Sequence, residues 1–266
     1  MSDAVCKICD KPADFYGAMK LLKKYNVRYF RCRACGFIQT EEPFWLDEVY
    51  AKAINHSDVG ILTRNKRLAD IARAVLNLFY DRQGRFLDYG GGYGIFVRMM
   101  RDRGFNFYRY DRYCENLLAK GYDIDDAGTG RFELLTSFEL FEHLVDPREE
   151  ISQMKRYADN ILFTTTLLPP GNPDLEEWWY FGKEHGQHIS FYTRKSLEIL
   201  AESLSLKLVS NNSSVHLFTN RKVSEALFSL ITQKPLVTLL MNKMHKNRSL
   251  ANEDYNSAVE RMFAGE

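Results

Sequence analysis

The sequence has almost no net charge, no long apolar run and few cysteines. Its 36 lysines and arginines and 35 acidic residues leave a formal charge of +1, so no field of the whole chain attracts nucleic acid or an anionic membrane. No apolar run approaches the roughly 18 residues of a transmembrane helix. Because the first residues also lack the basic-then-apolar pattern of a signal peptide, we expect a soluble cytoplasmic protein.

Four of the five cysteines stand in two pairs with metal-ligand spacing. Cys6 and Cys9 form one C-x-x-C pair, and Cys32 and Cys35 form another after 22 intervening residues. Each pair can supply two thiolates to one tetrahedral zinc ion, and a closed four-thiolate site leaves no position open for catalysis. We therefore expect structural zinc; two redox dithiols or four unmetallated buried thiols are the alternatives. Cys114 stands alone and is expected to be a packing residue.

Four glycines follow a short apolar stretch and an acid in residues 86–94. Asp88 precedes Gly90, Gly92 and Gly94, and the residues that follow have apolar spacing typical of a helix. This order predicts a strand, a tight turn and a helix start, where the absence of side chains lets a ligand approach the backbone. The spacing G-x-G-x-G differs from the dinucleotide fingerprint G-x-G-x-x-G. An ordinary glycine-rich turn in another Rossmann-like protein is the alternative.

A second acid lies at the end of the next expected strand. Residues 105–110 alternate with aromatic side chains and end at Asp111, 23 residues after Asp88. An acid in this position typically binds a ribose hydroxyl, so we expect Asp111, with Arg112 beside it, to contact a cofactor. A loop aspartate in a turn is the alternative. A helix is expected after Asp111, and a short third strand near residues 122–124.

Two later strands are expected at residues 132–136 and 161–166. Ligands bind outside the carboxyl ends of strands in such sheets, so residues 136–139 should face the crevice. These include Ser137 and Phe138 as cofactor contacts. The pattern E-x-x-E-H, formed by Glu139, Glu142 and His143, could place metal-binding side chains on one helix face; a structural role is the alternative.

A polar, aromatic segment at residues 176–192 follows the fifth expected strand and should overhang the crevice. Its candidate catalytic residues are Tyr180, Glu184, His185 and His188. The histidines are the leading candidates for a base, since imidazole titrates near neutral pH. Glu184 is a further candidate base, and Tyr180 could stack on a sugar or a flat ring. The alternative is that these side chains only hold the loop together.

The motif Asp-x-Gly-x-Gly-x-Gly at residues 88–94 resembles motif I of the class I S-adenosylmethionine (SAM) methyltransferases. Residues 137–147 resemble motif IV of the same enzymes, and the resemblance covers roughly residues 61–220. It implies an α/β, Rossmann-like seven-stranded sheet in the order 3-2-1-4-5-7-6 with strand seven antiparallel. It also implies SAM as cofactor, with its ribose held by Asp111. In the ubiquinone-biosynthesis O-methyltransferases, residues similar to the E-x-x-E-H pattern have been assigned to a divalent cation.

The four-cysteine module resembles that of zinc-containing sugar methyltransferases, notably the C-methyltransferases of deoxysugar biosynthesis. Those enzymes use a Glu-His pair after strand five, which Glu184 and His185 could match. They also carry a large extra C-terminal domain, whereas only about 45 residues follow the last expected strand here. The resemblance therefore implies a sugar, nucleotide sugar or glycan as acceptor, and the shorter C-terminal part favours methylation at a hydroxyl over methylation at a sugar carbon.

Two other functions are compatible with these motifs, an RNA methyltransferase with a zinc module and a non-catalytic SAM-binding module. The near-zero charge and the absence of an Asn/Asp-Pro-Pro-Tyr signature count against RNA. We expect a small-molecule partner and neither membrane nor nucleic acid. A homodimer through the C-terminal helices is one arrangement that their leucine and methionine content allows. The expected segments are a zinc-binding module at 1–42, connecting or lid helices at 43–84, a SAM-binding domain at 85–222 and C-terminal helices at 223–266.

Overall fold

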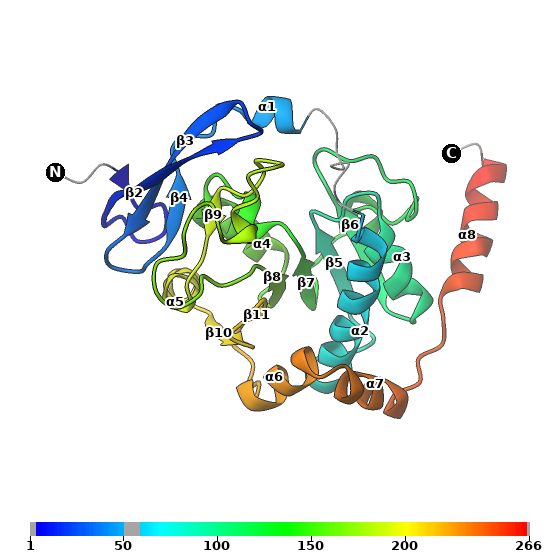
Figure 1. Ribbon diagram of the computed structural model, residues 1–266. Helices are drawn as coiled ribbons and strands as arrows, with labels where there is room; N and C mark the ends of the chain where they lie inside the picture. Colours follow the sequence, from blue (N-terminus) through cyan, green and yellow to red (C-terminus); the bar gives the residue numbers. More distant parts are fainter. Residues whose placement is uncertain (1–3, 51–58, 265–266) are drawn as a thin grey trace.

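The computed structural model describes residues 4–50 and 59–264 and contains two sheets (Figure 1). Parts of the expected segments, at residues 1–3, 51–58 and 265–266, lie outside the described residues. The larger sheet has six strands in the order β10-β11-β8-β7-β5-β6. In chain order they are β5 (Arg85–Tyr89), β6 (Asn106–Tyr110), β7 (Leu134–Ser137), β8 (Ile161–Thr164), β10 (Lys207–Ser210) and β11 (Val215–Thr219).

The pairing in this sheet confirms the expected α/β methyltransferase architecture. Strands β5, β6, β7 and β8 are parallel, and β11 is antiparallel to both of its neighbours. The expected third strand is not formed as a strand. At its place a single parallel bridge joins Arg109 to Asp123, and the 3-10 helix Ile124–Ala127 follows at once. Asp123 and Asp126 form a capping box on that helix. Their side chains therefore accept hydrogen bonds from backbone N–H groups that the pairing of a longer strand would have needed.

Alternate residues of the central strands enter two separate cores, one on each face of the sheet. Phe86 and Leu134 pack with helices α2 (Ile61–Phe79) and α3 (Ile95–Asp102). Their chain neighbours Leu87 and Leu135 pack on the other face. That face is covered by α4 (Pro147–Tyr157) and α5 (Arg194–Ser203). The continuous apolar strands of the sequence are explained by this burial on both faces.

The prediction of a helix directly after Asp111 is wrong. The chain there forms bends, and the backbone N–H groups of Leu117 and Leu118 donate to the carbonyl of Tyr93, at 3.3 and 3.0 Å. Asn116, which is buried, accepts from the Ala119 N–H at 2.9 Å. These bonds to the glycine-rich turn and within the loop replace the hydrogen bonds that a helix would have supplied.

The smaller sheet joins the cysteine-rich segment to the loop that follows β8. Its strands, in the order β1-β2-β3-β4-β9, are β1 (Ala4–Val5), β2 (Pro12–Leu21), β3 (Tyr25–Cys32), β4 (Ile38–Thr40) and β9 (Ser190–Phe191). The short helix α1 (Leu46–Val49) comes after β4 in the chain. A third core lies beneath this sheet, where Tyr29 packs against Phe181 and Phe191. The N-terminal module is thus completed by a strand from the catalytic part of the chain.

The C-terminal segment is helical, as expected, and its first helix ends just before Pro235. It consists of α6 (Glu225–Gln233), α7 (Pro235–Met244) and α8 (Ala251–Ala264). Asp254 anchors α8, because it accepts from Arg101 at 2.7 Å and from Tyr122 at 2.8 Å. No helix in the described residues is long and apolar enough to cross a membrane.

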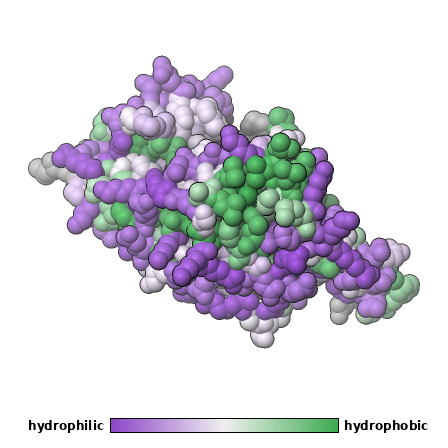
Figure 2. All heavy atoms as spheres, turned by 90° about the horizontal axis from the view of Figure 1, so that it is seen from below, coloured by the Kyte–Doolittle hydropathy of each residue, from purple (hydrophilic) through white to green (hydrophobic). Residues whose placement is uncertain are grey.

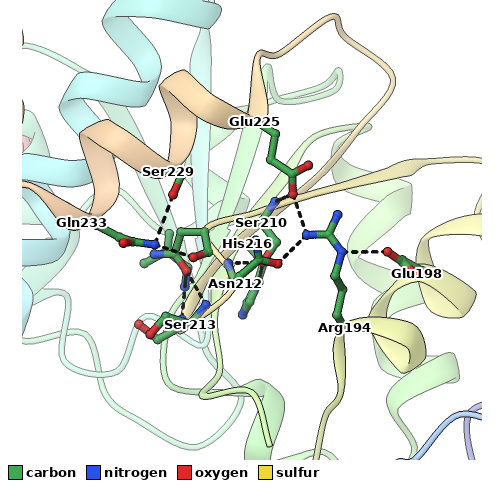
Figure 3. A network of polar contacts seen from close by, with 12 residues as sticks. Arg194, Glu198, Ser210, Asn212, Ser213, His216, Glu225, Ser229 and Gln233 are labelled. Carbon is green, nitrogen blue, oxygen red and sulfur yellow. Dashed lines mark hydrogen bonds and ion pairs between the residues drawn. The ribbon is translucent and has the colours of Figure 1, made fainter. Parts of the chain in front are cut away.

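A polar network ties α5, α6 and the β10–β11 turn together (Figure 3). Arg194 at the start of α5 forms an ion pair with Glu225 at the start of α6, at 2.7 Å. Behind it, the fully buried His216 donates from Nε2 to the carbonyl of Thr165 at 3.0 Å and accepts at Nδ1 from the Ser210 hydroxyl at 2.8 Å. Burial lowers the pKa of His216 to about 4, so this imidazole is neutral at pH 7 and has a structural role.

Candidate active site

A large cleft of about 1650 Å³ opens at the carboxyl ends of β5 to β8. One wall consists of the glycine-rich turn after β5 and the loop that begins at Asp111. The opposite wall carries the histidines of the 176–192 segment. Tyr50, at the end of the N-terminal module, spans both walls, because its ring stacks on Tyr113 and its hydroxyl lies 2.8 Å from His143 Nδ1. The cleft therefore lies where the strand topology predicts a ligand, between elements from three parts of the chain.

The turn after β5 needs glycine because Gly90, Gly92 and Gly94 all have positive φ, at 76°, 54° and 85°. A Cβ on Gly91 would stand 2.7 Å from the Arg109 side chain and 2.9 Å from the Asp88 carboxylate. A Cβ on Gly92 would meet nothing within 4 Å. The backbone at Gly92 is thus the part of the turn that a ligand can approach.

Asp88 lies beneath this turn and is 4% exposed. Its carboxylate accepts a hydrogen bond from the Thr136 hydroxyl at 2.7 Å. Burial raises the pKa of Asp88 to about 7, and the charge of Asp111 adds to the effect. Asp88 thus lies directly below the glycines, and its pKa is raised toward neutral pH.

Asp111 shapes the turn as well as facing the cleft. Its Oδ2 accepts from the Gly92 N–H at 2.9 Å, and its Oδ1 accepts from the N–H groups of Tyr113 and Cys114 at 2.8 Å. Arg112 also lines the cleft, where its guanidinium donates to Gln153 at 2.6 Å. The expected pair of carboxylates at two neighbouring strand ends is therefore present.

Arg109 is a site residue that our sequence reasoning missed. It is 5% exposed and donates to the carbonyls of Gly92 and Cys114 and to Asp123. One buried guanidinium thus holds the glycine-rich turn to the loop after β6. The sequence contained a signal for this burial. Phe105, Phe107 and Arg109 are alternate residues and share one face of the expected strand, and Phe105 and Phe107 are buried.

Of the two residues predicted at the end of β7, one lines the cleft. Phe138 is part of its wall and packs edge-on against Phe96, with ring centroids 5.0 Å apart. Ser137 is fully buried in β7 and outside the cleft lining, and its hydroxyl has no hydrogen-bond partner among the described residues. The alternation of a strand explains the difference, since consecutive side chains point to opposite faces.

On the opposite wall, Glu142 and His143 meet His188 from the 176–192 segment. Their ligand atoms all lie within 4.8 Å of one another. Glu142 is 1% exposed and its Oε2 has no hydrogen-bond partner among the described residues. Burial, with Glu139 nearby, raises the pKa of Glu142 to about 8. Glu139 itself is held by the Thr164 hydroxyl at 2.8 Å.

Hydrogen bonds assign different tautomers to the two predicted histidine bases. His188 Nδ1 lies 2.6 Å from the carbonyl oxygen of Tyr180, which can only accept, so Nδ1 carries the proton and Nε2 is free to accept one. His185 Nδ1 accepts from the Gln187 N–H at 3.1 Å, so its proton is on Nε2. Burial, with His185 nearby, lowers the pKa of His188 to about 3, and this keeps the ring neutral.

The structure separates the other two predicted catalytic residues. Tyr180 lines the cleft, and its hydroxyl accepts from the Thr166 N–H at 3.0 Å. Burial, with the charge of Glu142, raises the pKa of Tyr180 well above its usual value. Glu184 is exposed and is not part of the cleft lining. It sits in a turn between Gly182 and Gly186 whose outer side faces solvent, so its role as a base is not supported.

The four paired cysteines come together as the spacing predicted. Their sulfur atoms all lie within 4.8 Å, with Cys6–Cys35 at 3.6 Å and Cys9–Cys32 at 3.4 Å. A disulfide would need about 2.05 Å, whereas four thiolates about 2.3 Å from one metal ion stand about 3.8 Å apart. The donor set and spacing fit zinc. Cys114 is apart from this cluster and lines the large cleft.

A family model described as a methyltransferase domain matches residues 63–211, which is more than half of the chain. The chain belongs to the methyltransferase domain family. The predicted enzyme class is thereby confirmed, and the matched range includes the glycine-rich turn, both cleft carboxylates and His188. Among curated proteins, none matches the chain.

Solved methyltransferase structures resemble the chain at low sequence identity. The SAH-bound methyltransferase CalO1 of calicheamicin biosynthesis is 17% identical with a TM-score of 0.42, over 57% of this chain and 54% of that one. This chain therefore spans about half the length of CalO1. Magnesium protoporphyrin IX methyltransferase from Synechocystis PCC 6803, with bound SAH, is 11% identical with a TM-score of 0.43, over 65% and 90%. An O-methyltransferase family protein from Burkholderia thailandensis is 12% identical with a TM-score of 0.43, over 68% of each chain.

Proposed function

We propose that this protein transfers a methyl group from SAM to a sugar, nucleotide sugar or glycan, at a hydroxyl or an acidic carbon. The observation that carries the proposal is one cleft with two walls of different chemistry. One wall offers an open glycine backbone between two carboxylates, Asp88 and Asp111. The other offers a neutral imidazole, His188, with a free Nε2. The first wall suits a cationic nucleoside, and the second suits an acceptor that must lose a proton.

The glycine wall would hold the cofactor. Gly92 leaves room at the backbone, Asp111 provides a carboxylate for ribose hydroxyls, and Phe138 provides an apolar surface. SAM supplies a methyl group on a sulfonium, whose sulfur leaves with the bonding electrons as S-adenosylhomocysteine. The protein therefore mainly has to position the acceptor and remove its proton.

The histidine wall would activate the acceptor. We assign the base to His188, whose Nε2 takes the acceptor proton as the new bond to the methyl carbon forms. Glu142 stands within 4.8 Å. Its ionisation, which its raised pKa of about 8 places at alkaline pH, would raise the low pKa of His188 and stabilise the imidazolium. His185, protonated on Nε2, would instead donate a hydrogen bond to an acceptor oxygen.

Three features of the cleft support a sugar-class acceptor. Trp179 is 74% exposed at the cleft edge and offers a ring on which a sugar face can stack. Arg67 lies on the same cleft and makes no ion pair with the described residues, so it is available to a diphosphate. The side chains of Gln187, Ser213 and Ser214 add polar groups to the lining.

Zinc in the four-cysteine cluster would stabilise the module without taking part in the chemistry, since four thiolates fill a tetrahedral site. A divalent cation at Glu142, His143 and His188 is the alternative role of the histidine wall, favoured by the clustering of their ligand atoms. Elemental analysis separates the two. One zinc per chain supports the base assignment, whereas a second metal equivalent that is lost in His188→Asn supports the cation.

The test is turnover of methyl-labelled SAM over a panel of nucleotide sugars by His188→Asn, with His185→Asn as the matched variant. We expect His188→Asn to lower kcat by about 10²–10⁴-fold while SAM still binds, since this is the usual contribution of a general base. His185→Asn should lose less. Full activity of His188→Asn would refute the base assignment. Retention of labelled RNA that weakens steeply with salt would favour the RNA alternative.

A further inference from the structure

The outer surface of α6 and α7 is apolar and has no partner within the described residues. Leu236 is 68% and Met244 is 71% exposed. We call this surface the apolar face; its residues are Leu230, Leu236, Leu239, Leu240 and Met244. Figure 2, which views the molecule from the side on which these helices lie, shows a large hydrophobic area bordered by hydrophilic residues. Such areas on a soluble domain typically mark an interaction site.

Helix α7 is oriented against the usual pattern of a surface helix, which turns its apolar side inward. Its most buried residues, Thr238 and Asn242, are polar. Thr238 donates to the carbonyl of Ile231, and Asn242 donates to the carbonyl of Asp70 at 2.9 Å. Leu236, Leu240 and Met244 follow at helical spacing on the outer side. The inner side is therefore held by these hydrogen bonds together with Val237 and Met241, which pack against the core, and the leucines remain available on the outside.

The segment that carries the apolar face is rich in positive charge, although Arg221 within it is paired with Glu133. Residues 221–248 contain six lysines and arginines and one acid, Glu225, for a net +5. Glu225 is itself paired with Arg194. Lys234, Lys243 and Lys246 are exposed and make no ion pair within the described residues. Because the whole chain has a charge of only +1, the remainder carries −4, and this hides the local excess from the overall composition.

This charge decides between the two occupants that an apolar surface can take. A second copy of the chain would place the same lysines opposite one another across a two-fold axis, which is repulsive. An anionic bilayer offers acyl chains to the leucines and phosphates to the lysines. The cleft remains open in that arrangement, since its lining includes no residue of α6 or α7.

We propose that the apolar face and its surrounding lysines dock this protein onto an anionic membrane surface, with α7 lying in the plane of the interface. The docking is peripheral, because no described helix is both long and apolar enough to cross a bilayer. The inference does not depend on the identity of the acceptor. The proposal departs from our expectation that no membrane is involved, which rested on the whole-chain charge alone.

The test is flotation of the full chain with vesicles of phosphatidylcholine, with and without phosphatidylglycerol. We expect binding to the anionic vesicles only, weakened by salt. L236S/L240S should bind at least about tenfold more weakly, since each buried leucine contributes roughly 1.5–3 kcal/mol. K234Q/K243Q should lose about fivefold per removed lysine on anionic vesicles, as about 1 kcal/mol is assigned to each cation near such a surface.

M262S/F263S on α8 is the matched control, because Met262 and Phe263 are equally exposed but lie outside the apolar face. This variant should bind like the wild type, and all variants should keep the wild-type unfolding midpoint. Equal binding of wild type and L236S/L240S would overturn the proposal, as would wild-type binding to neutral vesicles alone. Absence of vesicle binding together with a dimer in sedimentation that L236S/L240S abolishes would assign the surface to a second copy instead.

Discussion

Asp88 illustrates how its surroundings, rather than its residue type, set the charge of a side chain. The sequence placed it under the glycine-rich turn, and the structure confirms that position. No sequence pattern predicts that burial raises the pKa of Asp88 to about 7, because that shift depends on Thr136, Asp111 and the depth of the turn. The same limit applies to His188, whose tautomer follows from one carbonyl of a residue eight positions earlier.

The first prediction at this scale concerns the pH dependence of cofactor binding. A cation bound near Asp88 favours the ionised carboxylate, so SAM affinity should fall as the pH drops through 7. We expect about tenfold tighter binding at pH 8 than at pH 6, as linkage to one group with a pKa of about 7 requires. Calorimetry of wild type and Asp88→Asn measures this. The variant should lose the pH dependence, whereas Asp47→Asn, at the exposed rim of the cleft, should keep it. A pH-independent wild type would contradict the prediction.

Several residues of the candidate site could be identified from sequence because their motif is local. The glycines, Asp88 and Asp111 lie within or next to strand ends, where spacing in the chain fixes position in space. Arg109 was missed because it acts through backbone carbonyls of other segments. Glu184 was named as a further candidate base although it is exposed, since periodicity does not show which side of a turn faces the cleft.

At the scale of elements, strand β9 was not predictable from the sequence, yet it links two parts of the molecule. It connects the cysteine module to the histidine wall through backbone pairs with β4. Trp45 reinforces the connection, because its indole N–H donates to the carbonyl of Gly186 at 2.8 Å. No sequence signal indicates that a two-residue strand from a distant loop will join the module. The order of the large sheet, by contrast, followed from the family resemblance.

This connection predicts that zinc affects catalysis indirectly. Cys32→Ser removes one of four thiolates, so the module should lose its zinc and its hold on the segment from Tyr180 to Phe191. We expect kcat/KM to fall by about a hundredfold, because small displacements of catalytic groups have effects of this size. Elemental analysis and amide exchange of residues 185–191 measure the two parts. Cys114→Ser should retain zinc and exchange protection; full zinc occupancy of Cys32→Ser would refute the four-thiolate site.

The two elements that sequence reasoning predicted wrongly have a common cause. The third strand and the helix after Asp111 both lie between β6 and β7, where side-chain hydrogen bonds compete with regular structure. Asp123 caps a 3-10 helix and also accepts from Arg109 at 2.7 Å. These tertiary bonds bind the segment to the glycine-rich turn. Local propensity does not include them.

At the scale of the whole molecule, two surfaces have separate roles. In Figure 1 the elements around the cleft meet toward the top, while α6 and α7 run along the lower edge. The proposed membrane face and the proposed methyl-transfer cleft therefore do not overlap. A protein docked through α7 would keep its cleft open to dissolved cofactor and acceptor.

The most direct test of the account is calorimetric titration of S-adenosylhomocysteine into the wild type, Asp111→Ala and His188→Asn. We predict one site per chain in the wild type, binding at least about tenfold weaker in Asp111→Ala, since a hydrogen bond to a charged group contributes about 1.5–3 kcal/mol. His188→Asn should bind as the wild type does, because it belongs to the other wall. Absence of binding in the wild type, or equal affinity of wild type and Asp111→Ala, would contradict the assignment of the glycine wall to the cofactor.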